Sequence, residues 1–432
     1  MEKIIGIIAD DLTGANDSGV QLTKKGINTS VLFDISVQQE YLDRGIVIDT
    51  NSRSLSKKEA ASVTREAASF LKASGYKHIY KKIDSTLRGH IGIELQVVNE
   101  VFNADFVFIA PAFPALGRTT LEGMHYVNGI RIDETEISKD TKHPVTESFI
   151  PTLIETEIQE KVGLLKMSDL DGDPSILQES IRRFKEENIT YIVCDAETQE
   201  DLQNAARKIA AISNSVIWAG SAGLAEVLPE VLGISKKVST NRSFSNSAQI
   251  MTVCGSLSKV TQKQVKFAEE QIDVKGVLVD TVQIFSYDWQ TLREEYIKSC
   301  LKGLGEGKDI VLYVPSNEKI RNQVWEKGNE LKLSSNQVGE LVSSRIGELV
   351  AEITKRNNVL SGLVLTGGDI AKDVARNLGG FGIRLVKQIE AGIPLGTLIG
   401  SNKEFTIVTK AGAFGKENSI YNAMQELKGV LK

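Results

Sequence analysis

The chain has 432 residues, of which 41% are hydrophobic and 25% are charged. This composition is typical of a globular protein with enough apolar residues for two or three cores, and it excludes a disordered chain. The formal net charge is −5, from 51 basic and 56 acidic residues, so there is no basic excess to neutralise a nucleic-acid backbone. We therefore expect no nucleic-acid partner.

The cysteines and the N-terminus limit the class of protein further. Cys194, Cys254 and Cys300 are far apart and form no CxxC pair, so we expect no disulfide framework and no zinc site. The four histidines lack metal-ligand spacing, so neither the histidines nor the cysteines are predicted to form a metal site. The chain shows no signal-peptide pattern and no run of about 18 apolar residues. We therefore predict a cytoplasmic protein without a membrane partner.

Along the first part of the chain, short apolar runs alternate with longer amphipathic stretches. This alternation predicts βαβ units, in which right-handed crossovers place helices on both faces of a mainly parallel sheet. Serine at the start and glycine at the end delimit the second expected helix. The strands are expected at residues 3–9, 28–34, 45–51, 78–84 and 104–111, and the helices at 14–26 and 56–75.

Residues 111–150 differ in character, because they are rich in turn formers and short extended pieces. We expect an inserted hairpin and loop region there, after which the α/β alternation resumes. A serine-rich stretch with little apolar periodicity, 233–248, is the predicted linker. The prediction is an α/β protein with two domains, 1–232 and 249–432, each a mainly parallel sheet flanked by helices.

Three segments of the second domain share one form, in which a glycine-containing loop joins an apolar strand to a helix. Glycine lets the backbone approach a ligand closely, and the N-terminus of a helix presents unpaired N–H groups and a positive dipole end. One such loop predicts only a turn, whereas three at one sheet edge also predict a pocket for phosphate or a nucleotide. The segments are 250–265, 362–378 and 405–424, and none contains the GxxxxGK[ST] motif of P-loop proteins.

Two adjacent carboxylates, Asp10 and Asp11, end the first predicted strand. One interpretation is that Asp11 caps the following helix by accepting hydrogen bonds from its first N–H groups. Two neighbouring acids at a buried strand end repel each other unless a cation lies nearby, so the pair also indicates a ligand site or catalysis. The sequence leaves these interpretations open.

Candidate cations follow two other predicted strands. The segment 80–90 carries Lys82, Asp84 and Arg88, and strand alternation sends Lys82 and Asp84 to the same face. Arg53 follows another strand. If these strands are neighbours, their carboxyl ends form one cleft of carboxylates and cations, suited to a small polyhydroxylated anion. A solvated cluster of salt bridges is the alternative.

Eight motifs, in chain order, are ADDLTGAND, KKIDSTLRGH, APAFPALGRTTLEG, GSAGLAEVL, CGSLSKVTQKQ, VLTGGDIA, GIPLGTLIG and TKAGAFG. Through these motifs the chain resembles the four-carbon acid sugar kinase family from about residue 3 to residue 428. The resemblance implies a sugar-acid-binding N-terminal domain, an ATP-binding C-terminal domain and an active site in the cleft between them. It also implies phosphoryl transfer from ATP, with Mg²⁺, to the C4 hydroxyl of D-threonate, D- or L-erythronate or a 3-oxo-tetronate.

The resemblance implies functions for particular residues. The expected substrate-binding residues are Asp10, Asp11, Arg53, Lys82, Asp84, Ser85 and Arg88. Asp84, Asp11 and Lys82 are also expected to be catalytic, with Asp84 or Asp11 accepting the hydroxyl proton. The expected nucleotide-binding residues are Ser256, Ser258, Gly367, Gly368, Asp369, Ile370 and Gly412.

The chain departs from the family pattern at Ile370, where a hydroxyl residue is expected, and at Ala411 and Ala413. Backbone contacts to phosphate would survive these changes, whereas a side-chain bond from position 370 would not. We expect phosphate oxygens and water to hold Mg²⁺, with Asp369 as a candidate protein ligand. The alternatives are a non-catalytic sensor of a sugar acid or nucleotide, and an ATP-dependent ligase acting on a sugar acid. The stereoisomer is not predicted, and a homodimer is left open.

Overall fold

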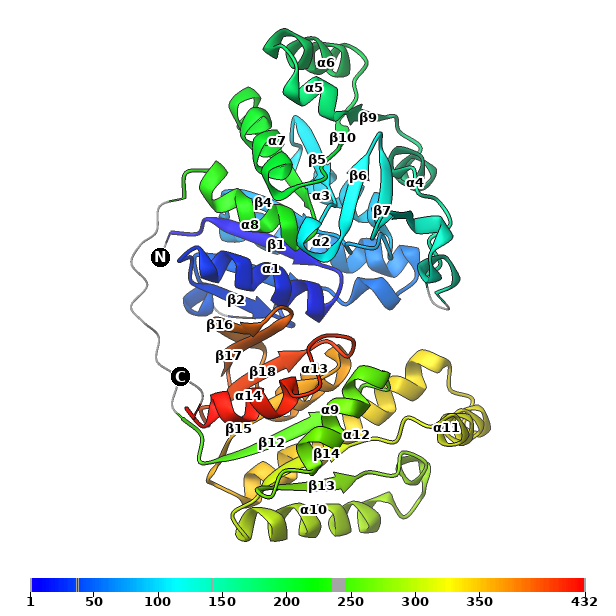
Figure 1. The fold of residues 1–432 in the computed structure, drawn as a ribbon, viewed down its shortest axis with the longest axis vertical. Helices are drawn as coiled ribbons and strands as arrows, with labels where there is room; N and C mark the ends of the chain where they lie inside the picture. Colours follow the sequence, from blue (N-terminus) through cyan, green and yellow to red (C-terminus); the bar gives the residue numbers. More distant parts are fainter. Residues whose placement is uncertain (1, 36, 38, 141–142, 235–245, 431–432) are drawn as a thin grey trace. The chain divides into compact units, whose positions relative to one another are not determined.

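The structure is a computed structural model that divides into two compact units, Met1–Thr240 and Asn241–Lys432. Each unit is described by itself (Figure 1). The predicted linker at 233–248 lies for the most part outside the described residues. The described residues are 2–35, 37, 39–140, 143–234 and 246–430.

The main sheet of the N-terminal unit is parallel throughout its described pairings, in the order β2-β3-β1-β4-β11-β5-β10-β9. Its strands are β1 (Ile5–Ala9), β2 (Thr29–Leu32), β3 (Gly45–Asp49), β4 (His78–Lys82), β5 (Phe106–Ala110), β9 (Val162–Leu165), β10 (Tyr191–Cys194) and β11 (Val216–Gly220). The buried residues of these strands are mainly Ile, Val, Leu and Phe, as expected for a sheet covered on both faces.

Helices cover both faces of this sheet (Figure 1). One face carries α1 (Leu12–Lys24), α7 (Gln199–Ile212) and α8 (Ala222–Val231). The other face carries α2 (Lys57–Ser74), α3 (Ile91–Phe102) and α4 (Ile150–Ile158). Two further helices, α5 (Met167–Asp171) and α6 (Pro174–Glu186), lie between β9 and β10 in the chain. The predicted alternation of strands and helices is confirmed.

Capping residues explain where two of these helices begin and end. Ser56 and Glu59 form a capping box at the start of α2, and Gly75 ends it in a left-handed conformation with φ of 78°. The helix predicted at 14–26 begins earlier, at Leu12, because the Asp11 carboxylate accepts a hydrogen bond from the Gly14 N–H at 2.8 Å. The capping interpretation of Asp11 is therefore correct.

The predicted insertion at 111–150 contains a small antiparallel sheet of β6 (Arg118–Leu121), β7 (Met124–Val127) and β8 (Ile130–Arg131). The turn between β6 and β7 has positive φ at Glu122 and Gly123. Both N–H groups of this turn donate to the Asp195 carboxylate, at 2.8 and 2.9 Å. Asp195 directly follows β10, so the insertion is fastened to the main sheet.

The C-terminal unit has parallel strands in the order β13-β14-β12-β15-β18, and β17 and β16 extend this sheet with antiparallel pairings. The prediction of a mainly parallel sheet is confirmed, although the antiparallel pair was not foreseen. The strands are β12 (Gln249–Cys254), β13 (Val274–Leu278), β14 (Asp309–Tyr313), β15 (Leu360–Thr366), β16 (Gly382–Glu390), β17 (Ile393–Ile399) and β18 (Thr406–Lys410).

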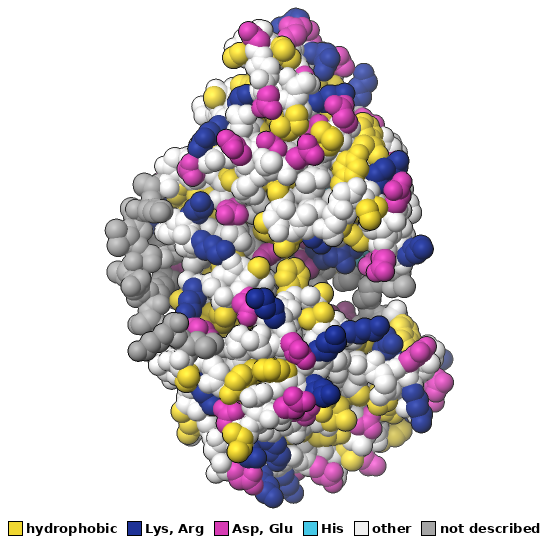
Figure 2. Space-filling model, viewed as in Figure 1, with side chains coloured by type: hydrophobic (Ala, Val, Ile, Leu, Met, Phe, Trp, Pro, Cys, Tyr) yellow, Lys and Arg dark blue, Asp and Glu magenta, His cyan; other side chains and the backbone are white. Residues whose placement is uncertain are grey.

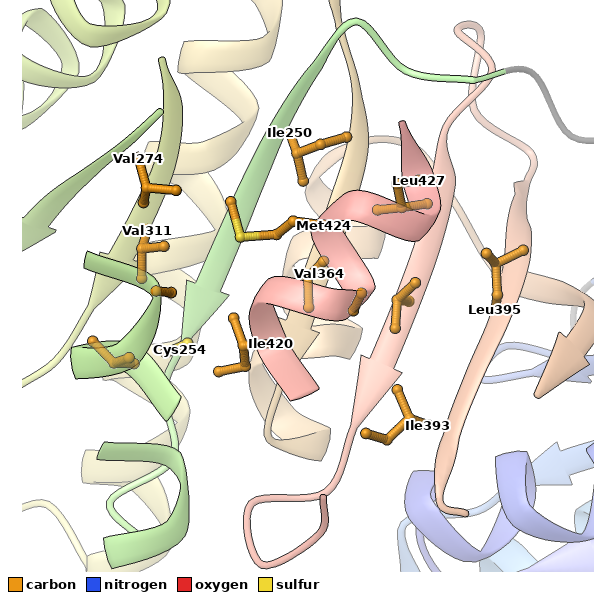
Figure 3. Packing of buried hydrophobic residues seen from close by; sticks show 14 residues of the cluster. Ile250, Cys254, Val274, Val311, Val364, Ile393, Leu395, Ile420, Met424 and Leu427 are labelled. Carbon is orange, nitrogen blue, oxygen red and sulfur yellow. The ribbon is translucent and has the colours of Figure 1, made fainter. Parts of the chain in front are cut away.

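The core of the C-terminal unit lies under α14, where Ile420 and Met424 pack above Ile250 and Val364 (Figure 3). All four side chains are fully buried. The helices are α9 (Lys259–Glu269), α10 (Trp289–Gly305), α11 (Glu318–Glu330), α12 (Ser335–Arg356), α13 (Gly368–Asn377) and α14 (Ser419–Leu427). The α9 and α14 helices pack together, as do α12 and α13.

Three other features bear on the sequence-based expectations. The three cysteines are buried and free, which agrees with the expected absence of a disulfide framework. Acidic and basic side chains are interspersed on the face of each unit shown in Figure 2. Within the described ranges, no helix combines the length and the apolar character needed to cross a membrane.

Candidate functional site

The site in the N-terminal unit begins where three neighbouring strands end. The β1 strand pairs with β3 and with β4, and Ala9 is in register with both Asp49 and Lys82. Because all three strands are parallel, the residues that follow them emerge at the same edge of the sheet. The neighbouring strands that the sequence prediction required are therefore present.

Arg53 joins the two adjacent carboxylates at the end of β1. It lies in the 3₁₀ turn η2 (Ser52–Ser54) that follows β3. Its Nε donates to Asp10 Oδ2 at 2.7 Å, and one terminal nitrogen donates to Asp11 Oδ2 at 2.8 Å. The Asp10 side chain is 3% exposed, whereas that of Asp11 is 26% exposed. Arg53 thus neutralises the repulsion between the two acids and leaves Asp11 within reach of a ligand.

The segment after β4 folds over this group. A Cβ on Gly89, whose φ is 101°, would lie 3.4 Å from Asp10 Oδ2. In the same segment, Arg88 Nε donates to Asp84 Oδ2 at 2.6 Å, and the Thr86 hydroxyl donates to the same oxygen at 2.6 Å. The two carboxylate–arginine groups therefore lie close together.

Lys82 and Ser85 complete the predicted set. The buried Lys82 ammonium donates to the Ile83 carbonyl at 2.7 Å, and a Cβ on Gly14 would lie 2.9 Å from it and 2.8 Å from Asp11 Oδ1. Lys82 thus lies beside Asp11. Ser85 is partly exposed next to Asp84, and its carbonyl accepts a hydrogen bond from His125 Nε2 at 2.9 Å. All seven predicted substrate-binding residues occur in this one region.

The three carboxylates of the site have different proton affinities. Burial opposes ionisation of Asp84, but the charges of Arg53 and Arg88 outweigh it and hold its pKa well below the ordinary value. For Asp10, burial is again outweighed, chiefly by Arg53, and the pKa is lowered. For Asp11, burial together with the negative charges of Asp10 and Asp84 raises the pKa in spite of Arg53. Asp11 is therefore the strongest base of the three.

A buried ion pair behind the site was missed by the sequence analysis. Lys81 points away from Lys82, and its Nζ lies 2.8 Å from Glu94 Oε2 on α3. The two side chains are 0% and 2% exposed, and the charge of Lys81 also lowers the pKa of Asp10. No pattern in the sequence indicated that Glu94 of α3 would meet Lys81.

The predicted nucleotide-binding residues also follow neighbouring strands. Cys254 of β12 is in register with Thr366 of β15, which is in register with Lys410 of β18. The three glycine-containing loops therefore leave the same edge of the sheet of the C-terminal unit. Gly367 caps α13 with φ of 94°, a conformation that favours glycine, and Gly368 begins the helix.

Ser256, Ser258 and Gly412 are in direct contact. The Ser258 hydroxyl donates to the Gly412 carbonyl at 2.5 Å and accepts from the Thr261 N–H as the cap of α9. A Cβ on Gly412 would lie only 2.1 Å from Ser256 Oγ. The absence of a side chain at Gly412 is what allows the first and third loops to meet this closely.

Ile370 and Asp369 border a pocket of about 270 Å³ in the C-terminal unit. Ile370 is 5% exposed, and a Cβ on Gly255 would lie 2.1 Å from its Cγ1, so Ile370 packs against the first loop. It contributes apolar surface rather than the hydroxyl expected there. Much of the remaining lining is apolar and includes Leu257, Ile320, Val324, Trp325, Val338 and Val342.

Lys410 was missed by the sequence analysis, although it ends a strand as Lys82 does. Its ammonium donates to the carbonyls of Ala411, Gly412 and Phe414, at 2.8, 3.3 and 2.9 Å. Burial lowers its pKa to about 8. Lys410 therefore holds the third glycine-containing loop in shape, and the parallel with Lys82 is the signal that would have identified it.

Comparison with known proteins gives results for both units. A family model described as a sugar-binding N-terminal domain matches residues 5–228, and one described as a nucleotide-binding C-terminal domain matches residues 251–420. The chain is 31% identical to a D-threonate kinase of Salmonella typhimurium, over 97% of each chain. It is 28% identical to a D-erythronate kinase of Heliobacterium modesticaldum, over 96% of this chain and 94% of that one.

A solved structure shares the fold. The chain matches a protein of Salmonella typhimurium LT2, described as a putative tRNA synthase, with a TM-score of 0.81 and 23% identity. The match covers 98% of this chain and 99% of that one. At this level of identity, the likeness supports the architecture and not the activity.

Proposed function

Because this chain belongs to the four-carbon acid sugar kinase family and is thus an enzyme that phosphorylates an alcohol group, we propose that it transfers the γ-phosphoryl group of ATP to the C4 hydroxyl of a four-carbon sugar acid. The observation that carries the proposal is the group formed by Asp10, Asp11 and Arg53 beside the Asp84–Arg88 pair. D-Threonate is the first substrate that we propose, since the relative at 31% identity is named a D-threonate kinase.

In this proposal, the cations and carboxylates of the N-terminal unit orient the acid. Lys82, Arg53 and Arg88 provide hydrogen-bond donors for the substrate oxygens, while Asp10 and Asp84 hold two of these cations in place. The partly exposed hydroxyl of Ser85 can bond a substrate hydroxyl. Positioning of this kind is the main contribution that a protein makes to phosphoryl transfer.

We assign the role of proton acceptor to Asp11. Of the two candidates that the sequence left open, Asp84 is bound directly by Arg88 and its pKa is lowered, whereas the pKa of Asp11 is raised. A base whose pKa is closer to the working pH is the more effective proton acceptor. Asp11 accepts the proton of the C4 hydroxyl as the bond from O4 to the γ-phosphorus forms and the bond from that phosphorus to the β-phosphate oxygen breaks.

The three glycine-containing loops of the C-terminal unit are the proposed seat of ATP. Backbone N–H groups at Gly367, Gly368 and Gly412, with the hydroxyl of Ser256, would bind the phosphates, as glycine loops at helix N-termini commonly do. The Ser258 hydroxyl, which donates to the Gly412 carbonyl, would hold the loops in place. The adjoining pocket suits a purine ring, because its lining is largely apolar and Ile370 forms part of one wall.

The same region offers one carboxylate that could bind Mg²⁺. Asp369 lies in the first turn of α13 beside the pocket, so its carboxylate is the proposed protein ligand. Mg²⁺ commonly takes one or two carboxylates and completes its coordination with phosphate oxygens and water. When bound, the ion would neutralise charge on the transferring phosphoryl group.

Coupled ADP release tests the proposal. The purified protein is assayed with ATP and Mg²⁺ against D-threonate, D-erythronate, L-erythronate and a 3-oxo-tetronate, with D-gluconate as a longer acid. We expect ADP release with at least one four-carbon acid and little with gluconate. Phosphorus NMR of the product should show a phosphate ester stable to hydroxylamine.

Other outcomes would support the alternatives. A hydroxylamine-sensitive acyl phosphate or an adenylate would indicate a ligase. Binding of the acid by calorimetry without any ADP release would indicate a sensor. Either result would contradict the kinase proposal.

A further inference from the structure

The charges of the acid-binding site are already balanced among its own side chains. Arg53 is bonded to Asp10 and Asp11, and Arg88 is bonded to Asp84. Another carboxylate, that of Asp140, lies 3.7 Å from Arg88. Even with Lys82 included, these four carboxylates outnumber the three cations. An anionic substrate therefore gains little net attraction from these groups and requires a further cation.

The inserted sheet brings one more arginine to this site. Arg118 begins β6, and its backbone N–H and carbonyl are both bonded to Phe113, at 3.1 and 2.9 Å. Two residues further along β6, Thr120 pairs with His125 of β7, whose Nε2 donates to the Ser85 carbonyl at 2.9 Å. This hydrogen bond fastens the β6–β7 hairpin to the segment that carries Asp84.

His125 is suited to a fixed structural role in this contact. Burial lowers its pKa to about 4, so the imidazole is neutral at physiological pH. Because a carbonyl only accepts, Nε2 carries the proton, and Nδ1 is left to accept from the Thr120 hydroxyl at 3.2 Å. The hairpin is thus held in one arrangement beside Ser85.

The guanidinium of Arg118 has N–H donors that make no hydrogen bond among the described residues. One terminal nitrogen donates to the Leu116 carbonyl. Its Nε is buried and has no hydrogen-bond partner, and none of the ion pairs found among the described residues includes Arg118. Because the Arg118 side chain is partly exposed, its other terminal nitrogen is left to donate to a ligand oxygen.

The electrostatic environment supports the placement of Arg118 at the site. Burial lowers the pKa of Arg118, while the negative charge of Asp84 raises it. The positive charge of Arg118 in turn adds to the lowering of the His125 pKa by burial. Arg118 therefore lies within electrostatic range of Asp84, although Asp84 is bonded to Arg88.

We propose that Arg118 is a substrate-binding residue that recognises the carboxylate of the sugar acid. The inference rests on the proposed function and deepens it, because it names the group that distinguishes an acid from a neutral polyol. The guanidinium donates from its remaining terminal nitrogen to the substrate carboxylate, as a charge-assisted hydrogen bond. The insertion that carries Arg118 then determines selectivity for an acid.

The test compares an acid with its uncharged counterpart. The substrates are D-threonate and D-threitol, in which a hydroxymethyl group replaces the carboxylate. In Arg118→Ala we expect the KM for D-threonate to rise on the order of 10- to 100-fold, which corresponds to losing one charge-assisted hydrogen bond. The KM for ATP and the activity with D-threitol should change less than twofold. Arg118→Lys should restore part of the loss.

A matched control comes from the same inserted sheet. Arg131 of β8 is bonded to Asp133 at 2.6 Å, and Arg131→Ala should leave the KM for both substrates unchanged. Thermal unfolding of each variant identifies misfolding, and Arg118→Gln replaces Arg118→Ala if the latter does not fold.

The inference is overturned if Arg118→Ala changes the KM for D-threonate by less than twofold, or weakens D-threonate and D-threitol equally. Its failure differs from failure of the proposed function, in which the wild type releases no ADP with any four-carbon acid. In that case, calorimetric binding of D-threonate to the wild type and to Arg118→Ala still decides the role of Arg118.

Discussion

Replacing Glu94 by glutamine should destabilise the N-terminal unit, because it removes the counter-charge of a fully buried lysine. Lys81 Nζ lies 2.8 Å from Glu94 Oε2, and neither side chain is more than 2% exposed. Breaking a buried ion pair by neutralising one partner costs about 3–5 kcal/mol. Asp10 is close enough for Lys81 to lower its pKa, so some counter-charge remains. We therefore expect the lower end of this range, about 3 kcal/mol.

Urea unfolding measures the loss in the free energy of unfolding. Hydrogen exchange of the peptides that contain β4 and α3 shows that the loss lies within the N-terminal unit. The control is Glu100→Gln on the same helix. Glu100 pairs with Arg65, but their side chains are 46% and 49% exposed. Because exposed pairs contribute about 0–1 kcal/mol, this variant should be nearly as stable as the wild type. Losses in the two variants that agree within about 1 kcal/mol would refute the reasoning.

Three further predictions concern activity. Asp11→Asn should lower kcat by orders of magnitude, and an unchanged kcat would exclude Asp11 as the base. Because only the ionised carboxylate accepts a proton, the wild-type kcat should fall as the pH decreases, with a midpoint above the ordinary aspartate pKa. At pH values above about 8, Lys410 loses its charge and one of the N–H donors that hold its loop, so the KM for ATP should increase. Lys410→Arg should abolish this increase, and a KM for ATP that does not depend on pH in the wild type would contradict the prediction. Asp369→Ala should raise the Mg²⁺ concentration needed for half-maximal rate with little effect on the KM for the acid, and an unchanged Mg²⁺ dependence would remove Asp369 from the ion's ligands.

Local signals in the sequence predicted most of the fold. Ser56 and Gly75 delimited α2 because a serine cap and a left-handed glycine act within a few residues of the chain. The apolar runs predicted the parallel strands because each is short and bounded by turn formers. The antiparallel strands β16 and β17 were not foreseen, since strand direction depends on distant pairing.

The site was predictable to the extent that it depends on strand ends. Residues that follow parallel neighbouring strands share an edge, and this rule grouped Asp10, Arg53 and Lys82. The rule about strand ends could not identify Arg118, because Arg118 comes from an inserted hairpin whose position depends on the contact between His125 and Ser85. Such contacts depend on side-chain directions and on packing between elements distant in the chain.

The different proton affinities of the carboxylates follow from what each one binds. Asp84 accepts two hydrogen bonds on a single oxygen, from Arg88 and Thr86, and a carboxylate held in this way is a poor base. Asp11 shares Arg53 with Asp10 and also lies beside Lys82, but its burial and the negative charges of Asp10 and Asp84 outweigh these cations. A bound sugar acid would bring a further negative charge and raise the proton affinity of Asp11 again. Asp11 would therefore be most basic when a hydroxyl is present to be deprotonated, and the cation that binds the substrate carboxylate would limit this effect.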